Sequence, residues 1–158
     1  MTVGEIEAAL LDAARLEPED DVLVFGGGPL AFGAHERIGE GWVYVVRAQV
    51  GELEELLGEA HAAGASGVAY LVGEAPVLPL PDAAVSAAVG WIAIEEEGAL
   101  TGVAEELARV LRPRGRVALA EPGREHAAAV AAALEKGGFE PSPLAEMGEV
   151  VLVAARLR

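Results

Sequence analysis

The chain has 158 residues, no cysteine, and a net charge of −15 from 26 acids and 11 bases. Its length suits one domain over residues 1–158. The composition excludes disulfides, thiolate metal sites and cysteine nucleophiles. It disfavours nucleic acids and membranes as partners, because both are bound through Lys and Arg. The start does not resemble a signal peptide, so we expect a cytoplasmic protein.

Helices and strands alternate through the first half of the chain, as judged from apolar periodicity. Thr2 is a candidate cap for the first helix. The predicted elements are a helix over 2–16, a strand over 21–25, a glycine turn over 26–28, a helix over 30–38, a strand over 42–47, a helix over 51–63 and a strand over 67–72.

The second half continues this alternation after a proline-rich loop over 73–82. It predicts strands over 85–91, 116–120, 142–147 and 149–156, and helices over 100–111 and 125–136. Such alternation is typical of the α/β class, here as a doubly wound, mostly parallel seven-stranded sheet in a single domain. The last two strands lie close in sequence, so we expect one of them to run antiparallel at the sheet edge.

The segment from Asp21 to Leu30 is a buried apolar strand that runs into a glycine turn and a helix. Open α/β domains hold nucleotide-like cofactors at this kind of turn. The residue 19 positions after Gly28, where a ribose-binding acid is expected, is Arg47. A guanidinium has no hydrogen-bond acceptor.

Three motifs resemble, in order, those of small class I S-adenosylmethionine-dependent methyltransferases of type 11. Gly39–Tyr44 resembles the segment leading into the second strand, Leu78–Asp82 is similar to "LPFPD", and Arg109–Pro113 is similar to "RVLKP". The resemblance implies the Rossmann-like methyltransferase fold. It also implies S-adenosylmethionine as cofactor.

The same resemblance implies a set of cofactor-binding positions, with departures from the family pattern. Val24 takes the place of an acid, Leu30 that of the third glycine, and Pro29 removes one N–H donor. Glu74 takes the place of an acid that contacts the adenine amino group. The cofactor-binding residues implied are Gly26, Gly27, Gly28, Arg47, Glu74 and Ala75.

Three functions stay open. The first is a divergent methyltransferase acting on an unknown small molecule or protein, and the second is an inactive methyltransferase-like scaffold that binds a partner. The third is a phosphorylated dinucleotide site, because Gly26-x-Gly-x-x-Ala31 is followed by Arg47 at the end of the next strand. The chain has no inserted lid over the cleft, and a homodimer is one way to cover it.

Other chemistry-bearing residues give weaker signals. His35, His61 and His126 fall in separate predicted helices without ligand spacing, so no metal site is expected. Glu95–Glu97 and Trp91 lie at the carboxyl end of the fourth predicted strand, where substrates approach. No catalytic residue is predicted, because methyl transfer depends mainly on positioning.

Overall fold

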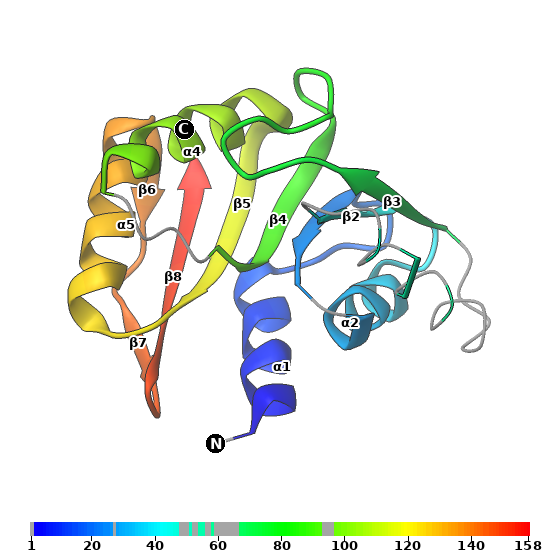
Figure 1. Cartoon of the computed structure of the whole chain (residues 1–158), viewed down its shortest axis with the longest axis horizontal. Helices are drawn as coiled ribbons and strands as arrows, with labels where there is room; N and C mark the ends of the chain where they lie inside the picture. The colour runs from blue at the N-terminus through cyan, green and yellow to red at the C-terminus, as the bar shows by residue number, and fades with distance from the viewer. Residues whose placement is uncertain are drawn as a thin grey trace.

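The computed structural model of the chain describes residues 2–26, 28–47, 51, 54, 55, 58, 67–92 and 97–158 (Figure 1). The predicted helix over 51–63 falls mostly outside these residues. None of the helices in the described ranges is long and apolar enough to cross a membrane. The named helices are α1 (Val3–Ala14), α2 (Gly28–Ile38), α4 (Glu97–Val110) and α5 (Arg124–Lys136).

The strands form one sheet in the order β3-β2-β1-β4-β5-β8-β6, with β7 also paired to β8. Strands β1 to β5 run parallel to one another, as predicted, and β8 runs antiparallel to β5, β6 and β7. Their bounds are β1 (Val22–Phe25), β2 (Val43–Arg47), β3 (Val68–Val72), β4 (Val85–Trp91), β5 (Leu111–Glu121), β6 (Phe139–Pro141), β7 (Ala145–Met147) and β8 (Val150–Leu157).

The number of strands in the sheet differs from the prediction. Within the described residues the sheet holds eight strands instead of seven, because the segment after α5 forms two short strands that both pair with β8. The expected antiparallel edge strand is β7, which lies off the main strand order and pairs with β8. Strand β8 is also antiparallel and lies between β5 and β6. A short strand of three residues, β6, covers that side of β8.

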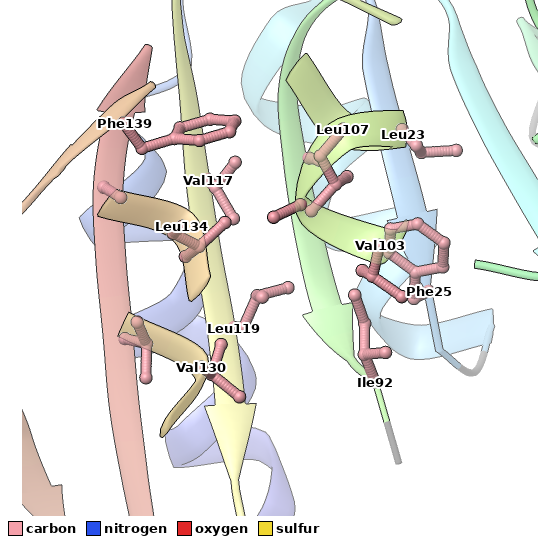
Figure 2. Packing of buried hydrophobic residues seen from close by; sticks show 14 of the residues in the cluster. Leu23, Phe25, Ile92, Val103, Leu107, Val117, Leu119, Val130, Leu134 and Phe139 are labelled. Atoms are coloured by element: carbon pink, nitrogen blue, oxygen red, sulfur yellow. The ribbon is translucent and has the colours of Figure 1, made fainter. Parts of the chain in front are cut away.

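Two apolar layers pack on the two faces of the sheet. Helices α4 and α5 cover one face, where Val103 and Leu107 of α4 and Leu134 of α5 point toward the strands (Figure 2). Helices α1 and α2 cover the other face. Helix α1 buries four apolar residues that recur at helical spacing in the sequence, Ile6, Leu10, Leu11 and Ala14.

The first helix begins where the sequence predicts. The Thr2 hydroxyl accepts a hydrogen bond of 3.1 Å from the Glu5 N–H, which satisfies one of the free donors of the first turn. Helix α1 also contacts β4 and β5. The cap therefore fixes the start of a helix that covers the middle of the sheet.

Candidate functional site

The glycine turn lies at the point where the strand order reverses. From β1 the chain builds the sheet outward through β2 and β3 on one side, and then through β4 and β5 on the other. Ligands of open α/β sheets bind at this switch point, beyond the carboxyl ends of the strands. Gly26 follows β1 there, and Trp91 ends β4 beside it, because Phe25 and Gly90 are register partners.

Gly90 allows β4 to approach β1 closely. It has φ +141, and an added Cβ would lie 1.9 Å from the Phe25 carbonyl oxygen. An L side chain neither adopts this conformation readily nor fits this space. The residue therefore helps set the distance between the two strands that flank the switch point.

Apolar side chains fill the space directly over the first glycine. A Cβ on Gly26 would lie 3.0 Å from Leu30 Cδ2 and 3.5 Å from Trp91 Cδ1. Leu30 is fully buried and belongs to the core under α1 and α2, as does Val24 at the family's acid position. These two departures from the family motif are therefore parts of the core. Pro29, in the first turn of α2, sits where helix N–H groups lack internal partners and is tolerated.

The next two predicted cofactor residues lie at the same edge of the sheet. Arg47 ends β2, and its carbonyl accepts a hydrogen bond of 2.9 Å from Gly73 N–H, just after β3. Glu74 follows in a tight turn closed by a bond of 2.9 Å from Val77 N–H to the Glu74 carbonyl. The Glu74 side chain is exposed, and Ala75 packs against the core. Gly28 opens α2, whereas Gly27 lies outside the described residues.

A buried carboxyl group ends β5 at this edge. The Glu121 side chain is 1% exposed, and its Oε2 lies 3.0 Å from His126 Nε2 in the first turn of α5. In the described part of the chain neither carboxyl oxygen accepts a hydrogen bond. Burial without such bonds disfavours the charged form. It raises the pKa of Glu121 to about 8.

The sequence did not single out this pair. The predicted fifth strand ends at Ala120, one residue before Glu121, and His126 is predicted only to lie in a helix without ligand spacing to another histidine. A signal was present, because an acid follows an apolar strand and Pro122-Gly123 turns the chain into the helix that carries His126. The burial of the acid, however, depends on how α5 packs.

The other candidates contribute less to this edge. A Cβ on Gly67, just before β3, would lie 3.3 Å from His35 Nε2, so His35 lies toward the amino ends of the strands and does not line the cleft. Glu97 opens α4. His61, Glu95 and Glu96 lie outside the described residues. Within the described ranges no group of three metal-ligating side chains occurs.

Comparison with known proteins relates the chain to solved structures only. No family model matches the sequence, and no curated protein matches it. A S-adenosylmethionine-dependent methyltransferase from Aquifex aeolicus superposes with a TM-score of 0.79 at 20% identity, over 95% of this chain and 88% of that chain. A precorrin-6y C5,15-methyltransferase from Geobacter metallireducens gives 0.79 at 17% identity, over 100% and 90%.

One similar structure is named for a different reaction. The [4+2]-cyclase SpnF superposes with a TM-score of 0.84 at 15% identity, over 98% of this chain and 80% of that chain. At such identities the likeness concerns the backbone, and one fold can host unrelated functions. The strand order, the antiparallel β8 and these superpositions show that the chain has the fold of the class I S-adenosylmethionine-dependent methyltransferases.

Proposed function

We propose that the chain binds S-adenosylmethionine at the carboxyl edge of its sheet and is a divergent methyltransferase of a small molecule or protein. The observation that carries this proposal is the glycine turn at the switch point, where Gly26 follows β1 and Gly28 begins α2. The free N–H groups at the start of α2 favour a carboxylate. We therefore place the methionine end of the cofactor there.

The residues present fit the two ends of this cofactor unequally. Glu74 is exposed after β3 and offers a carboxylate to the adenine amino group. At the end of β2, Arg47 cannot accept a hydrogen bond from a ribose hydroxyl. We expect backbone groups and Glu74 to provide most of the binding energy, and the affinity to be weak.

The Glu121–His126 pair suits a proton-accepting role in this reaction. S-adenosylmethionine supplies an electrophilic methyl group, and a hydroxyl or amine acceptor loses a proton when it is methylated. Ala120, next to Glu121, is the register partner of Trp91. Only β4 separates β5 from β1, so the carboxyl end of β5 is roughly 10 Å from the glycine turn. A carboxyl group with a pKa near the working pH is suited to general base catalysis.

A second candidate is a scaffold of the same fold that does not bind the cofactor. Two observations favour it: Leu30 covers Gly26, and Arg47 stands where a ribose-binding acid is expected. Losing hydrogen bonds to a charged group costs about 1.5–3 kcal/mol each. The cytoplasmic location and the homodimer stay predictions under either function.

Calorimetric titration with S-adenosylmethionine and S-adenosylhomocysteine distinguishes the two candidates. Under our proposal both ligands bind, Glu74→Ala weakens binding, and Arg47→Asp strengthens it at least tenfold because two ribose hydroxyls gain an acceptor. Arg47→Ala is the matched control, since it removes the cation without adding an acceptor. If neither the natural chain nor Arg47→Asp releases heat at millimolar ligand, the scaffold is the better description. A titration with a phosphorylated dinucleotide tests the third function, in which Arg47 binds the phosphate of such a ligand.

A further inference from the structure

A second cleft lies at the opposite, amino edge of the sheet. It has a volume of about 1220 Å³ and is formed by the end of α1, the start of β5, the segment from β6 to Pro143, and the end of β8. Because β8 runs antiparallel to β5, its last residues lie beside the first residues of β5. The cleft is therefore separate from the glycine turn. Its lining includes five arginines, Arg15, Arg112, Arg114, Arg116 and Arg156, in a chain with only 11 basic residues.

Two of these arginines are already neutralised by the fold. Arg112 lies 2.8 Å from the Asp21 carboxylate and donates to Ser86 Oγ over 3.0 Å. Arg116 pairs with Asp20, which is buried, and donates to the Ala14 carbonyl over 2.8 Å. Both side chains are thus held by partners that explain their presence.

The other three guanidinium groups have no such explanation. Within the described residues, no ion pair or side-chain hydrogen bond involves Arg15, Arg114 or Arg156, and all three residues are exposed. Within the described residues the lining carries these three unpaired guanidinium groups beside two unpaired carboxylates, Glu17 and Glu140, a local balance unlike the net charge of −15. Arginine in such a setting favours ligands with several acceptor oxygens, such as phosphate.

Backbone conformation at two of these positions is costly for arginine. Arg15, which follows the last residue of α1, has φ 50, and Arg114, inside β5 where the pairing with β4 is irregular, has φ 65. Glycine is the usual residue at both kinds of position, and a residue with a side chain costs on the order of 1–2 kcal/mol there. Strained residues of this kind are concentrated at ligand-binding positions. Both strained arginines line the same cleft.

A third local conflict lies on the neighbouring strand. Arg156 of β8 is the register partner of Arg116 of β5, and like charges directly opposite each other destabilise a sheet. On its other side Arg156 faces Glu140 of β6 in register, without an ion pair. Since Asp20 already compensates Arg116, Arg156 is the guanidinium group of this strand pair that a bound anion would neutralise.

The acids in the lining indicate which kind of anion fits. Glu17 and Glu140 also line the cleft and have exposed side chains, and Asp12 is paired with Arg37. Free carboxylates accept hydrogen bonds from hydroxyl groups. The cleft is also larger than the roughly 300–1,000 Å³ of typical small-molecule pockets. It therefore suits a ligand that has both a phosphate and a hydroxyl-bearing organic part.

We propose that this cleft binds a phosphate ester of a hydroxylated small molecule, with Arg15, Arg114 and Arg156 on the phosphate and Glu17 and Glu140 on the hydroxyls. The site is independent of the proposed cofactor site, because the two lie at opposite edges of the sheet. It goes beyond methyl transfer, since the ligand can act as an effector or be carried by the protein even if the carboxyl edge is inactive.

Calorimetry and thermal unfolding with inorganic pyrophosphate and ribose 5-phosphate test this site. We expect both to bind at millimolar or lower concentration and to raise the melting temperature. Arg114→Gly should raise the melting temperature of the free protein, because glycine suits φ 65, and should lower the affinity for both probes at least fivefold. If Arg114 had only a structural role, a substitution that raises the melting temperature would not also weaken ligand binding. Arg156→Gln should weaken binding similarly.

The matched control is Arg124→Gln, which removes one arginine at the start of α5, at the other edge of the sheet. It should leave pyrophosphate binding unchanged. Equal weakening in Arg124→Gln and Arg156→Gln would mean that only net charge matters, and would overturn the proposal. So would a lack of binding by the natural chain, or binding of poly-glutamate without binding of pyrophosphate, since the latter would identify an acidic protein segment as the occupant.

Discussion

The guanidinium of Arg109 lies 3.0 Å from the carboxylate of Asp82 and donates a hydrogen bond of 3.1 Å to the Leu78 carbonyl. Glu106 joins this network, because it accepts bonds from Arg109 Nε over 2.5 Å and from Leu78 N–H over 2.6 Å. Two of the three motifs that resemble the methyltransferase family are therefore joined by hydrogen bonds, Leu78–Asp82 and Arg109–Pro113. They connect the loop before β4 to the end of α4, and so they identify the fold rather than the reaction.

Removing Arg109 should weaken the folded state. In Arg109→Met the half-buried Glu106 loses its cation, and the loop before β4 loses two of its hydrogen bonds. Arg109 holds the pKa of Glu106 below its usual range, so this stabilisation is present above the ordinary pKa of the carboxyl and is lost as pH falls through the lowered value. We expect a lower urea midpoint at pH 7, and a smaller difference from the natural chain in acid.

The exposed Arg124–Glu146 pair supplies the control for this measurement. Its side chains are 66% and 61% exposed, and surface pairs of this kind contribute little. Arg124→Met should leave the urea midpoint nearly unchanged. Equal midpoints for Arg109→Met and Arg124→Met would show that the motif contact does not stabilise the loop.

The buried Glu121 predicts a distinctive pH dependence of stability. Burial raises its pKa from the ordinary 4.5 to about 8, so between these values the folded state holds a proton that the unfolded state has released. Stability should then fall as pH rises from about 4.5 to about 8, and level off above that. In Glu121→Gln this fall should disappear, and the variant should be more stable than the natural chain at pH 9. Urea denaturation across this pH range measures both effects.

Glu125→Gln separates this effect from a general change in net charge. Glu125 is exposed on the same first turn of α5, so its loss changes the charge equally without removing a buried carboxyl group. This variant should keep the fall in stability with pH. If it behaves like Glu121→Gln, the pH dependence arises from net charge and not from the buried group.

Most of the fold could be predicted from the sequence, because its determinants are local. Four apolar residues at helical spacing marked α1, and the mostly apolar run Val85–Trp91 gave β4 its observed bounds. The start of β5 could not be predicted from the sequence. Pro113 has no N–H and reads as a break before a strand, whereas Leu111 pairs with Val85 from a distant part of the chain. The ladder therefore begins before the proline, with an irregularity in register.

The sequence predicts where the backbone of the candidate site lies, but it does not predict the contacts of the side chains there. The position of the Gly26 turn follows from the strand before it, and the place of Arg47 follows from its spacing. The role of Leu30 depends on contact between α2 and the end of β4, where Trp91 lies. Glu121 is buried because α5 folds back onto β5. Both are consequences of packing between segments, and sequence periodicity does not record them.

Two glycine substitutions should have opposite effects on stability. Gly90→Ala places a methyl group 1.9 Å from the Phe25 carbonyl oxygen at φ +141, so we expect it to destabilise by more than about 4 kcal/mol, the range of severe mutations. Gly102→Ala lies inside α4, where the nearest atom to its Cβ is at 4.0 Å. It should stabilise by about 0.5–1 kcal/mol through helix propensity. Thermal unfolding of both variants checks the pair, and a Gly90→Ala variant as stable as the natural chain would contradict the close approach of β4 to β1.

The two tryptophans of the chain lie at opposite edges of the sheet and can locate the cofactor. Trp91 ends β4 beside the glycine turn, whereas Trp42 precedes β2, is 50% exposed, and donates its backbone N–H to Asp21 over 3.0 Å. Trp42→Phe leaves Trp91 as the fluorescent reporter. In this variant S-adenosylhomocysteine should change the tryptophan fluorescence, and the titration should give the dissociation constant found by calorimetry. In Trp91→Phe the change should be lost, because Trp42 lies away from the turn. A ligand-dependent change that persists in Trp91→Phe and is absent in Trp42→Phe would place the ligand at the amino edge and contradict the proposed position of the cofactor over Gly26.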